Sequence, residues 1–343
     1  MDRPPLRRFL SAPHLERPGA ELALLIALAA LLELAAGVGL AYVAGFSQVR
    51  AALGRFDWVW LAVVAGALAA SFVGYFYGYR GIHRVDGGPE LSGRQMHAVV
   101  AAGFGGFLAH GGGALDRYAL QAAGASEEEA KARAAGLGGL EYGVLAIGGC
   151  GAAIVILVSG FGAPPADFTL PWAILPVPGM LLGFWLAERY RDRLRDRGSW
   201  RRVVWTFLEA IHLIRELCIH PLRWGWAPLG MALFWAADAF AVWAGLAAFG
   251  FRMGVASLIV GYATGMVFTR RTGPLAGAGL LALFLPLCLW YCGAPLAVAV
   301  AGVFAYRVLA LWLPMPLALA FLPTLRTMGE RRIARQRPAR KAA

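Results

Sequence analysis

The stretch GFGGFLAHGGGALDRYAL, residues 103–120, breaks a chain that otherwise consists largely of apolar runs. Six of its eighteen residues are glycine, and an acid and a base, Asp116 and Arg117, follow the last of them. The apolar segment 97–109 is too short to cross a bilayer, because a spanning helix needs roughly 20 residues. We therefore expect a re-entrant hairpin, in which two half-helices meet at a turn on residues 111–113 and protein covers the non-helical backbone.

The composition of the whole chain is typical of an integral membrane protein. Of its 343 residues 59% are hydrophobic and 15% are charged, and the mean hydropathy is +0.61. Soluble domains carry about 25% charged residues. We expect an all-α integral membrane fold, a polytopic helix bundle. The apolar runs near or above the length of a membrane span are 21–46, 58–79, 142–161, 170–187, 228–250 and 295–322.

The net charge of +12 indicates a membrane topology rather than binding to nucleic acid, because the basic residues gather between the apolar runs. They crowd the N-terminus 1–20, the loop 188–227 and the tail 324–343, whereas the loop 162–169 has no Lys or Arg. An excess of Lys and Arg marks cytoplasmic loops. We predict a multi-pass protein of the cell inner or plasma membrane, with a membrane domain at 21–323 and with both termini and the 188–227 loop in the cytoplasm.

The second half of the chain repeats this plan in the opposite orientation. Residues 258–268 are again too short to span, 270–279 turn on glycines and a proline, and an apolar piece follows at 280–292. Gly124-Ala125-Ser126 is echoed by Gly293-Ala294-Pro295 after the second turn. Inverted repeats with paired, interrupted helices are typical of transporters. We therefore expect two re-entrant half-helix hairpins in inverted repeats, with two short full crossings as the alternative for 255–292.

Two more helices are expected on the cytoplasmic side. Residues 202–217 have apolar side chains at helical spacing, which predicts an amphipathic helix in the membrane interface, with partner binding as the alternative role. A short helix is expected to begin at Ser126, because Glu129 three residues later completes a capping box. The next membrane span is then expected to open at Glu141.

Four segments share their order and spacing with a known family. They are HGGGALDRYALQAAGASEEEAKARAAGLGGLEYGVL (110–145), FWAADAFAVWAGLAAFG (234–250), GYATGMVFTRRTGPLAGAG (261–279) and AYRVLALWLP (305–314). Together they resemble the membrane domain of lysylphosphatidylglycerol synthases, the flippase-like domain of the bacterial multiple-peptide-resistance factor, over roughly residues 20–325. The resemblance implies a multi-helix membrane domain with re-entrant segments that binds and translocates a lipid.

The resemblance does not extend to the synthase activity. In the synthases a separate soluble domain transfers lysine from aminoacyl-tRNA to phosphatidylglycerol, and residues 324–343 leave no room for it, so a stand-alone form is expected. Many relatives carry Pro-x-Pro-Gly-Gly-x-Gly-x-x-Glu in the second turn. Here Pro274, Gly277 and Gly279 remain, but Ala282 replaces the acid. A role of that carboxylate is therefore not carried over, and the substrate is expected to differ accordingly.

Ionisable side chains within apolar runs are costly, so each is a functional hypothesis. Arg307, next to Tyr306 in the last run, is the strongest, because a guanidinium binds a phosphate bidentately. Tyr306 and Asp238 are expected to bind the headgroup with it. The alternative is a structural ion pair between Arg307 and Asp238, which is compatible with binding if the pair opens around the ligand. Glu33 in the first run has no partner that the sequence identifies.

The remaining candidates lie beside the predicted turns. Asp116, Arg117, Glu141 and Tyr142 are expected to line a polar cavity for the lipid headgroup, with the acids facing a cationic or hydroxylated group. The alternatives are an interfacial salt bridge for the first two and, for Glu141, an exposed acid at a helix N-terminus. The turn glycines are expected to let backbone amides approach a phosphate, or to serve helix packing. These are Gly111, Gly112, Gly113, Gly277 and Gly279.

The expected function is lipid translocation: binding of a phospholipid, or another anionic or amino-modified lipid, and its transfer between leaflets. Membrane lipids are the expected partners, with a lipid-modifying enzyme as a protein partner in one alternative, an accessory subunit. The other alternative is an integral membrane transferase, but no HExxH, CxxC or paired-Asp metal signature is present. No catalytic residue, metal or cofactor is predicted. Buried free thiols are expected at Cys150, Cys218, Cys288 and Cys292.

Overall fold

A computed structural model describes residues 19–104, 112–160, 164–194, 199–267 and 279–328 of the chain, and over these ranges the protein is helical without strands. Within these ranges, six helical segments are long and apolar enough to cross a membrane. They are α2 (Gly19–Ala44), α4 (Val59–Arg84), α7 (Glu127–Ser159), α8 with α9 (Ala166–Ile174 and Pro176–Leu194), α11 (Ala227–Ala247) and α14 with α15 (Leu296–Trp312 and Pro314–Ala320). All six predicted spans are thus confirmed as apolar helices.

Two of the six segments are broken near one end by proline. Pro176 begins α9 directly after α8, and Pro314 begins α15 directly after α14. Proline lacks the amide hydrogen that would continue the helical hydrogen bonds, and its ring clashes with the preceding turn. Each segment therefore continues as two helices rather than one.

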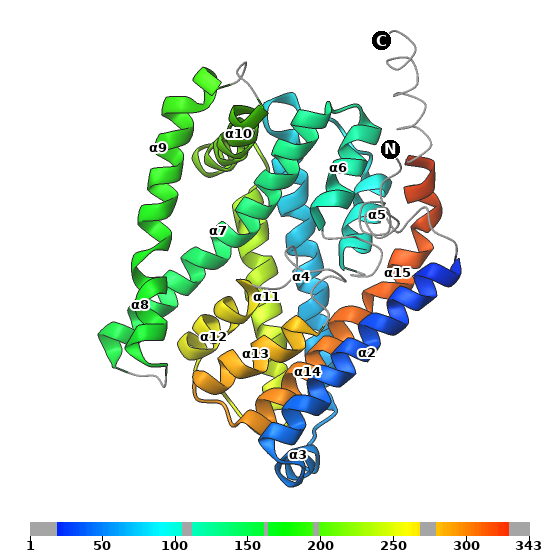
Figure 1. Ribbon diagram of the computed structural model, residues 1–343, viewed down its shortest axis with the longest axis vertical. Helices are drawn as coiled ribbons and strands as arrows, with labels where there is room; N and C mark the ends of the chain where they lie inside the picture. Colours follow the sequence, from blue (N-terminus) through cyan, green and yellow to red (C-terminus); the bar gives the residue numbers. More distant parts are fainter. Residues whose placement is uncertain (1–18, 105–111, 161–163, 195–198, 268–278, 329–343) are drawn as a thin grey trace.

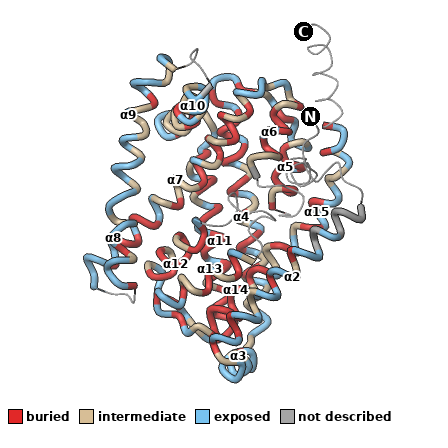
Figure 2. The backbone as a smooth tube through the Cα atoms, viewed as in Figure 1, coloured by how far each residue is buried: buried red, intermediate tan, exposed pale blue. Residues whose placement is uncertain are grey.

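The centre of the molecule is the contact between α4 and α11 (Figure 1), and the buried residues concentrate there (Figure 2). Glycines let the two backbones approach. A Cβ at Gly74 would lie 2.5 Å from the Phe234 amide nitrogen, and one at Gly230 would lie 2.8 Å from the Gly74 carbonyl oxygen. Small residues at helix contacts replace the hydrophobic driving force that is missing between helices in lipid.

Helix α7 differs from the sequence prediction. The expected capping box is present, since Ser126 Oγ accepts a hydrogen bond from the Glu129 amide at 3.1 Å. However, the helix that starts there does not end before the span. It runs without a break from Glu127 to Ser159, so the prediction of a separate short helix is wrong. Its 33 residues measure about 50 Å, more than the thickness of the hydrocarbon layer, and Figure 1 shows that it runs diagonally past the upright α4.

Four short helices come in two pairs. The first pair is α5 (Gly93–Phe104) with α6 (Gly112–Ala123), and the second is α12 (Val255–Val267) with α13 (Leu280–Tyr291). With 12 or 13 residues, each is about 20 Å long, too short for a hydrocarbon layer of about 30 Å. The first pair lies in the upper half of Figure 1 and the second in the lower half.

The second helices of the two pairs end in the same way. At the end of α6 the Gly124 amide donates to Gln121 and the Ala125 amide to Leu120; at the end of α13 the Gly293 amide donates to Trp290 and the Ala294 amide to Leu289. Both glycines have positive φ, 113° and 102°, which glycine adopts without strain. This is the Schellman arrangement, and a long helix, α7 or α14, follows each copy directly.

The predicted amphipathic helix is confirmed as α10 (Ser199–Ile219), and it lies beside the arginine-rich end of α9. Ion pairs hold it there, between Arg191 and Glu209 at 3.7 Å and between Arg215 and Glu188 at 3.8 Å. Cys218 near its end is exposed, so the expectation that all four thiols are buried is wrong for this residue.

One arginine joins α7 to the end of α4. The buried Arg133 donates from Nη1 to the carbonyl oxygens of Ile82 and His83 and from Nη2 to that of Val85, at 3.0–3.2 Å, while its Nε donates to Glu129. The last carbonyls of a helix have no partner within the helix. Arg133 supplies these partners from another helix.

Candidate functional site

A buried carboxylate lies at the middle of α11. Asp238, 4% exposed, accepts two hydrogen bonds at Oδ2, one from the Tyr262 hydroxyl on α12 at 2.5 Å and one from the Tyr306 hydroxyl on α14 at 2.8 Å. Burial of an ionised carboxylate is costly unless hydrogen bonds compensate. Three helices, α11, α12 and α14, therefore meet at one acid.

The charge of Arg307 is balanced by Glu33 rather than by Asp238. Arg307 Nε donates to Glu33 Oε1 at 2.8 Å, and Nη2 also contacts this oxygen. The alternative ion pair of Arg307 with Asp238 is therefore wrong. Consecutive residues of an α-helix point about 100° apart, so Tyr306 faces α11 while Arg307 faces α2.

An apolar groove lies near the pair Glu33–Arg307, although neither charged residue lines it. A cavity of about 540 Å³ is lined by residues of α2, α14 and α3 (Phe46–Leu53), and it includes Leu34 and Val308, the sequence neighbours of the two charged residues. Exposed side chains form part of its wall, including Leu34 and Val38 of α2. The groove is thus lined by apolar side chains, and Glu33 and Arg307 are the sequence neighbours of two of them.

Glu141 and Tyr142 of α7 contact α11 at Trp235. Glu141 is 1% exposed and belongs to the interior of α7, so its interpretation as an exposed acid at a helix N-terminus is wrong. Its backbone carbonyl accepts a hydrogen bond from Trp235 Nε1 at 2.6 Å, and the Tyr142 and Trp235 rings are 6.4 Å apart. The continuous α7 is the reason, because it carries Glu141 into the protein.

Asp116 and Arg117 are adjacent in α6 but differ in their surroundings. Asp116 is 4% exposed, whereas Arg117 is exposed and donates from Nε to the Gly113 carbonyl at 3.0 Å. Helix α6 packs against α5 and α7, while Arg307 lies on α14, which packs against α11, α13 and α2. Asp116 and Arg117 therefore belong to the pair α5–α6 and lie apart from Arg307 and its partner Glu33.

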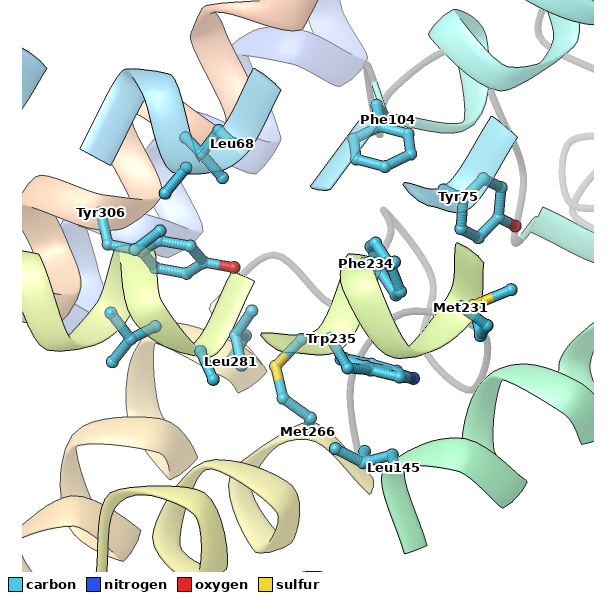
Figure 3. Close-up of a cluster of buried hydrophobic side chains, with 14 of the residues drawn as sticks. Leu68, Tyr75, Phe104, Leu145, Met231, Phe234, Trp235, Met266, Leu281 and Tyr306 are labelled. Atoms are coloured by element: carbon cyan, nitrogen blue, oxygen red, sulfur yellow. The ribbon is translucent and has the colours of Figure 1, made fainter. Parts of the chain in front are cut away.

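The last residue of α5 and the second half of α12 both contact the middle of α11 (Figure 3). The ring of Phe104, the last residue of α5, lies 5.9 Å from that of Phe234. The ring of Tyr262 in α12 lies 5.9 Å from that of Trp235. Figure 3 shows Phe104 and Tyr75 on one side of Phe234, and Met266 beside Trp235. Phe234 and Trp235, consecutive residues of α11, thus contact α5 and α12 respectively.

The turns themselves lie mostly outside the described residues, and so do Gly111 and Gly277. Gly112 begins α6, and Gly113 is in its first turn with nothing within 4 Å of an added Cβ. Gly279 precedes α13 with φ of 81°, and an added Cβ would lie 3.3 Å from Leu32 of α2. A side chain larger than hydrogen would therefore strain this entry to α13.

Sequence reasoning missed three residues of the site: the role of Glu33 as partner of Arg307, and the contributions of Tyr262 and Trp235. For Glu33 the available signal was that it and Arg307 are both charged residues within long apolar runs, and such residues pair with one another. For Tyr262 and Trp235 no signal in one sequence specifies which helices meet. Among the described residues no three His, Cys, Asp or Glu side chains lie close enough to hold a metal ion.

The chain matches no protein-family model and no curated protein sequence.

Proposed function

We propose that the protein is a flippase-like lipid transporter of the cell inner or plasma membrane, which binds a phospholipid or another anionic or amino-modified lipid and moves it between leaflets. The observation that carries this proposal is the charged pair Glu33–Arg307 beside an apolar groove of about 540 Å³. A phospholipid has the same division into a charged headgroup and apolar chains. An arginine binds its phosphate bidentately, and the groove receives an acyl chain.

The charges of Arg307 and Glu33 determine how the headgroup binds. Arg307 exchanges the carboxylate of Glu33 for a phosphodiester of equal charge, so that the buried guanidinium keeps a counter-ion throughout. Removal of the only partner of a buried charge is costly, whereas an exchange of partners avoids that cost. Asp238, with Tyr262 and Tyr306 as donors, holds a cationic or hydroxylated part of the headgroup next to it.

The path through the membrane is proposed to consist of two re-entrant hairpins in inverted repeats. The short lengths of α5, α6, α12 and α13 support this, as do the identical hydrogen bonds at Gly124 and Gly293. The arrival of α5 and α12 at the middle of α11 supports a meeting point at mid-depth. Half-helices of this kind place polar backbone where a headgroup would otherwise cross hydrocarbon.

The proposed orientation has both termini and the end formed by α9 and α10 in the cytoplasm. The support is the basic composition of this end, which the positive-inside rule assigns to the cytoplasm. The lower end of Figure 1, with α3, then faces the opposite side of the membrane.

Transport is tested in liposomes reconstituted with the protein and a trace of lipid with a fluorescent headgroup label. Membrane-impermeant dithionite bleaches only the outer leaflet, so it leaves about half of the signal in protein-free vesicles. We expect the wild type to lower this plateau for some headgroup classes, and Arg307→Gln and Tyr306→Phe to abolish the effect. The exposed Arg202 of α10 supplies the control Arg202→Gln, which is expected to retain activity. A plateau at the protein-free value for anionic, zwitterionic and amino-modified lipids alike would refute transport.

A further inference from the structure

A second cavity lies apart from the Arg307 cluster, where α7 ends and α12 begins, in the lower half of Figure 1. Its volume of about 500 Å³ is within the usual range for small-molecule sites. The lining includes Ser159 of α7, the segment 251–257, and Gly293 after α13. No acidic residue is among the lining residues.

The segment 251–254 that forms one wall is held by its own hydrogen bonds. The Gly250 amide donates to Ala247 and the Phe251 amide to Leu246, which closes α11 with φ of 79° at Gly250. Trp243 Nε1 donates to the Met253 carbonyl at 3.0 Å. The backbone that leads into α12 is therefore fixed before any ligand binds, which lowers the entropic cost of binding.

The lining is largely apolar, and its polar side chains include two hydrogen-bond donors, Arg252 and Ser257. Arg252 is exposed and takes part in no ion pair with a described residue. Ser257 is only 8% exposed, lines the cavity, and its hydroxyl forms no hydrogen bond within the described ranges. This unpartnered hydroxyl lines the cavity and can donate a hydrogen bond to a ligand there.

The start of α12 adds backbone donors to these side chains. The Leu258 amide bonds to Gly254, as in any first turn, and the amides of Val255, Ala256 and Ser257 before it have no partner inside the helix. The 13-residue α12 also places the positive end of its dipole here. Such an end, together with an arginine and a hydroxyl, has the chemistry of an oxyanion site.

We infer that this cavity binds a phosphate-class oxyanion, either the phosphodiester of a lipid headgroup or free phosphate. Arg252 supplies the counter-charge, Ser257 and the first amides of α12 supply directed hydrogen bonds, and the cavity holds a group as large as phosphoglycerol. The inference does not depend on the proposed transport, because the site would bind its anion whether or not a lipid crosses the membrane.

The test measures the thermal unfolding midpoint of the full-length protein in a zwitterionic detergent against ligand concentration at constant ionic strength. One arm uses inorganic phosphate and the other a short-chain phosphatidylglycerol. We expect a saturable rise with at least one of the two. Arg252→Gln is expected to raise the half-saturating concentration roughly tenfold, and Ser257→Ala several-fold, the sizes expected for loss of one charged and one neutral hydrogen bond. Arg50→Gln, which changes an exposed arginine of α3 outside the cavity lining, is the control and should leave it unchanged.

Saturation by inorganic phosphate identifies the free anion as a ligand, and saturation by the lipid alone identifies the headgroup. The inference is overturned if neither ligand shifts the midpoint, or if Arg252→Gln and Arg50→Gln respond as the wild type does. The dithionite measurement separates this result from transport. Loss of anion binding in Arg252→Gln with lipid flipping intact would support the anion site and show that it does not lie on the path of the transported lipid. Flipping by a wild type that binds no anion would refute the anion site but not the proposed transport.

Discussion

Tyr306 and Arg307 are neighbours in α14, yet they bond to acids on different helices. Tyr306 donates to Asp238 on α11, and Arg307 pairs with Glu33 on α2. Asp238 and Glu33 therefore lie at two different contacts of α14, one with α11 and one with α2. A ligand that changes the partner of Arg307 also changes the contact between α14 and α2.

The substitution Glu33→Gln tests the ion pair. It leaves the guanidinium of Arg307, whose side chain is 7% exposed, without a counter-ion, which is expected to cost about 3–5 kcal/mol of stability. The measurement is thermal unfolding of the detergent-purified protein. Glu188→Gln is the control: that carboxylate is 69% exposed and 3.8 Å from Arg215, so its loss should cost less than about 1 kcal/mol.

The double variant Glu33→Leu with Arg307→Met separates the charge from the packing. Replacement of a buried ion pair by apolar groups of similar volume is often neutral. We expect this variant to unfold within about 1 kcal/mol of the wild type while losing lipid transport. Equal stability of Glu33→Gln and the wild type would contradict a stabilising ion pair between Glu33 and Arg307.

At the residue scale, the sequence identified which positions are unusual but not their partners. Arg307 and Asp238 stand out because charge is rare in apolar runs, and Asp116 because it follows a glycine-rich segment; all three are buried. The pairing of Arg307 with Asp238 was wrong because it depends on which face of α14 meets which helix. Glu141 was misplaced because the local sequence does not show that α7 continues past it.

At the scale of elements, the closest helix contact is the one between α4 and α11. Gly74 in α4 faces backbone atoms of Gly230 and Phe234, so the two helices touch main chain to main chain. This contact brings Phe234 and Trp235 to the point that α5 and α12 reach. A separation of α4 from α11 would therefore displace the centre of the site.

Gly74→Ala is expected to destabilise the protein by about 1–3 kcal/mol, since an added Cβ would lie 2.5 Å from the Phe234 nitrogen and 2.6 Å from the Gly230 oxygen. Backbone atoms cannot move aside as a flexible side chain can. Gly66→Ala in the same helix is the matched control, because nothing lies within 4 Å of its added Cβ. It should stabilise the helix by up to about 1 kcal/mol. Similar shifts of the unfolding midpoint in both variants would disprove the close contact.

Arg133→Met tests the connection between α7 and the end of α4. The substitution keeps the apolar part of the side chain but leaves the carbonyls of Ile82, His83 and Val85 without their donor. Loss of these charged hydrogen bonds is expected to cost about 2–4 kcal/mol. Amide hydrogen exchange in the last turn of α4 should become faster as well.

Lys131→Met is the control for Arg133→Met. Lys131 is half-buried, lies two residues away in α7, and among the described residues pairs with Glu127 four positions earlier. Its loss should cost no more than about 0.5 kcal/mol and leave the exchange in α4 unchanged. If both variants behave alike, Arg133 does not hold the end of α4.

At this scale the sequence predicted most of the fold. The six long apolar helices and the four short ones follow from the length of each apolar run and from its glycines and prolines. The helix boundaries missed at Glu127–Ser159 have a physical cause: Glu141 is tolerated inside α7 because Trp235 and neighbouring helices cover it, and this contact is not encoded locally.

At the scale of the whole molecule, the arginine-rich end and the α3 end lie on opposite sides (Figure 1). The native Cys218 on α10 is an exposed thiol at the arginine-rich end, so it reports the orientation. In a variant with alanine at Cys150, Cys288 and Cys292, a membrane-impermeant maleimide should label inverted vesicles and not right-side-out vesicles. Labelling from the outside would contradict the proposed orientation.

The pH dependence of this labelling has a definite sign. Cys218 is exposed as a residue, but neighbouring groups partly desolvate its thiol, which raises the pKa above its ordinary value of 9.0. The thiolate is the reacting form, so Cys218 should react more slowly at pH 8 than a fully solvated cysteine and gain rate as the pH rises further. The comparison is made with Arg202→Cys on the same helix, in the same variant with Cys218 also replaced. A rate at Cys218 that equals or exceeds the rate at this position would contradict the effect of burial.

The central claim, that the groups around Asp238 and Arg307 contact a lipid headgroup, is tested most directly by native mass spectrometry of the protein released from nanodiscs of mixed lipids. The account predicts that the wild type and Arg202→Gln retain one lipid class in preference to the bulk. Tyr306→Phe and the variant Glu33→Leu with Arg307→Met are expected to lose this preference while remaining folded. Retention of the same lipid class by all four proteins would contradict the account.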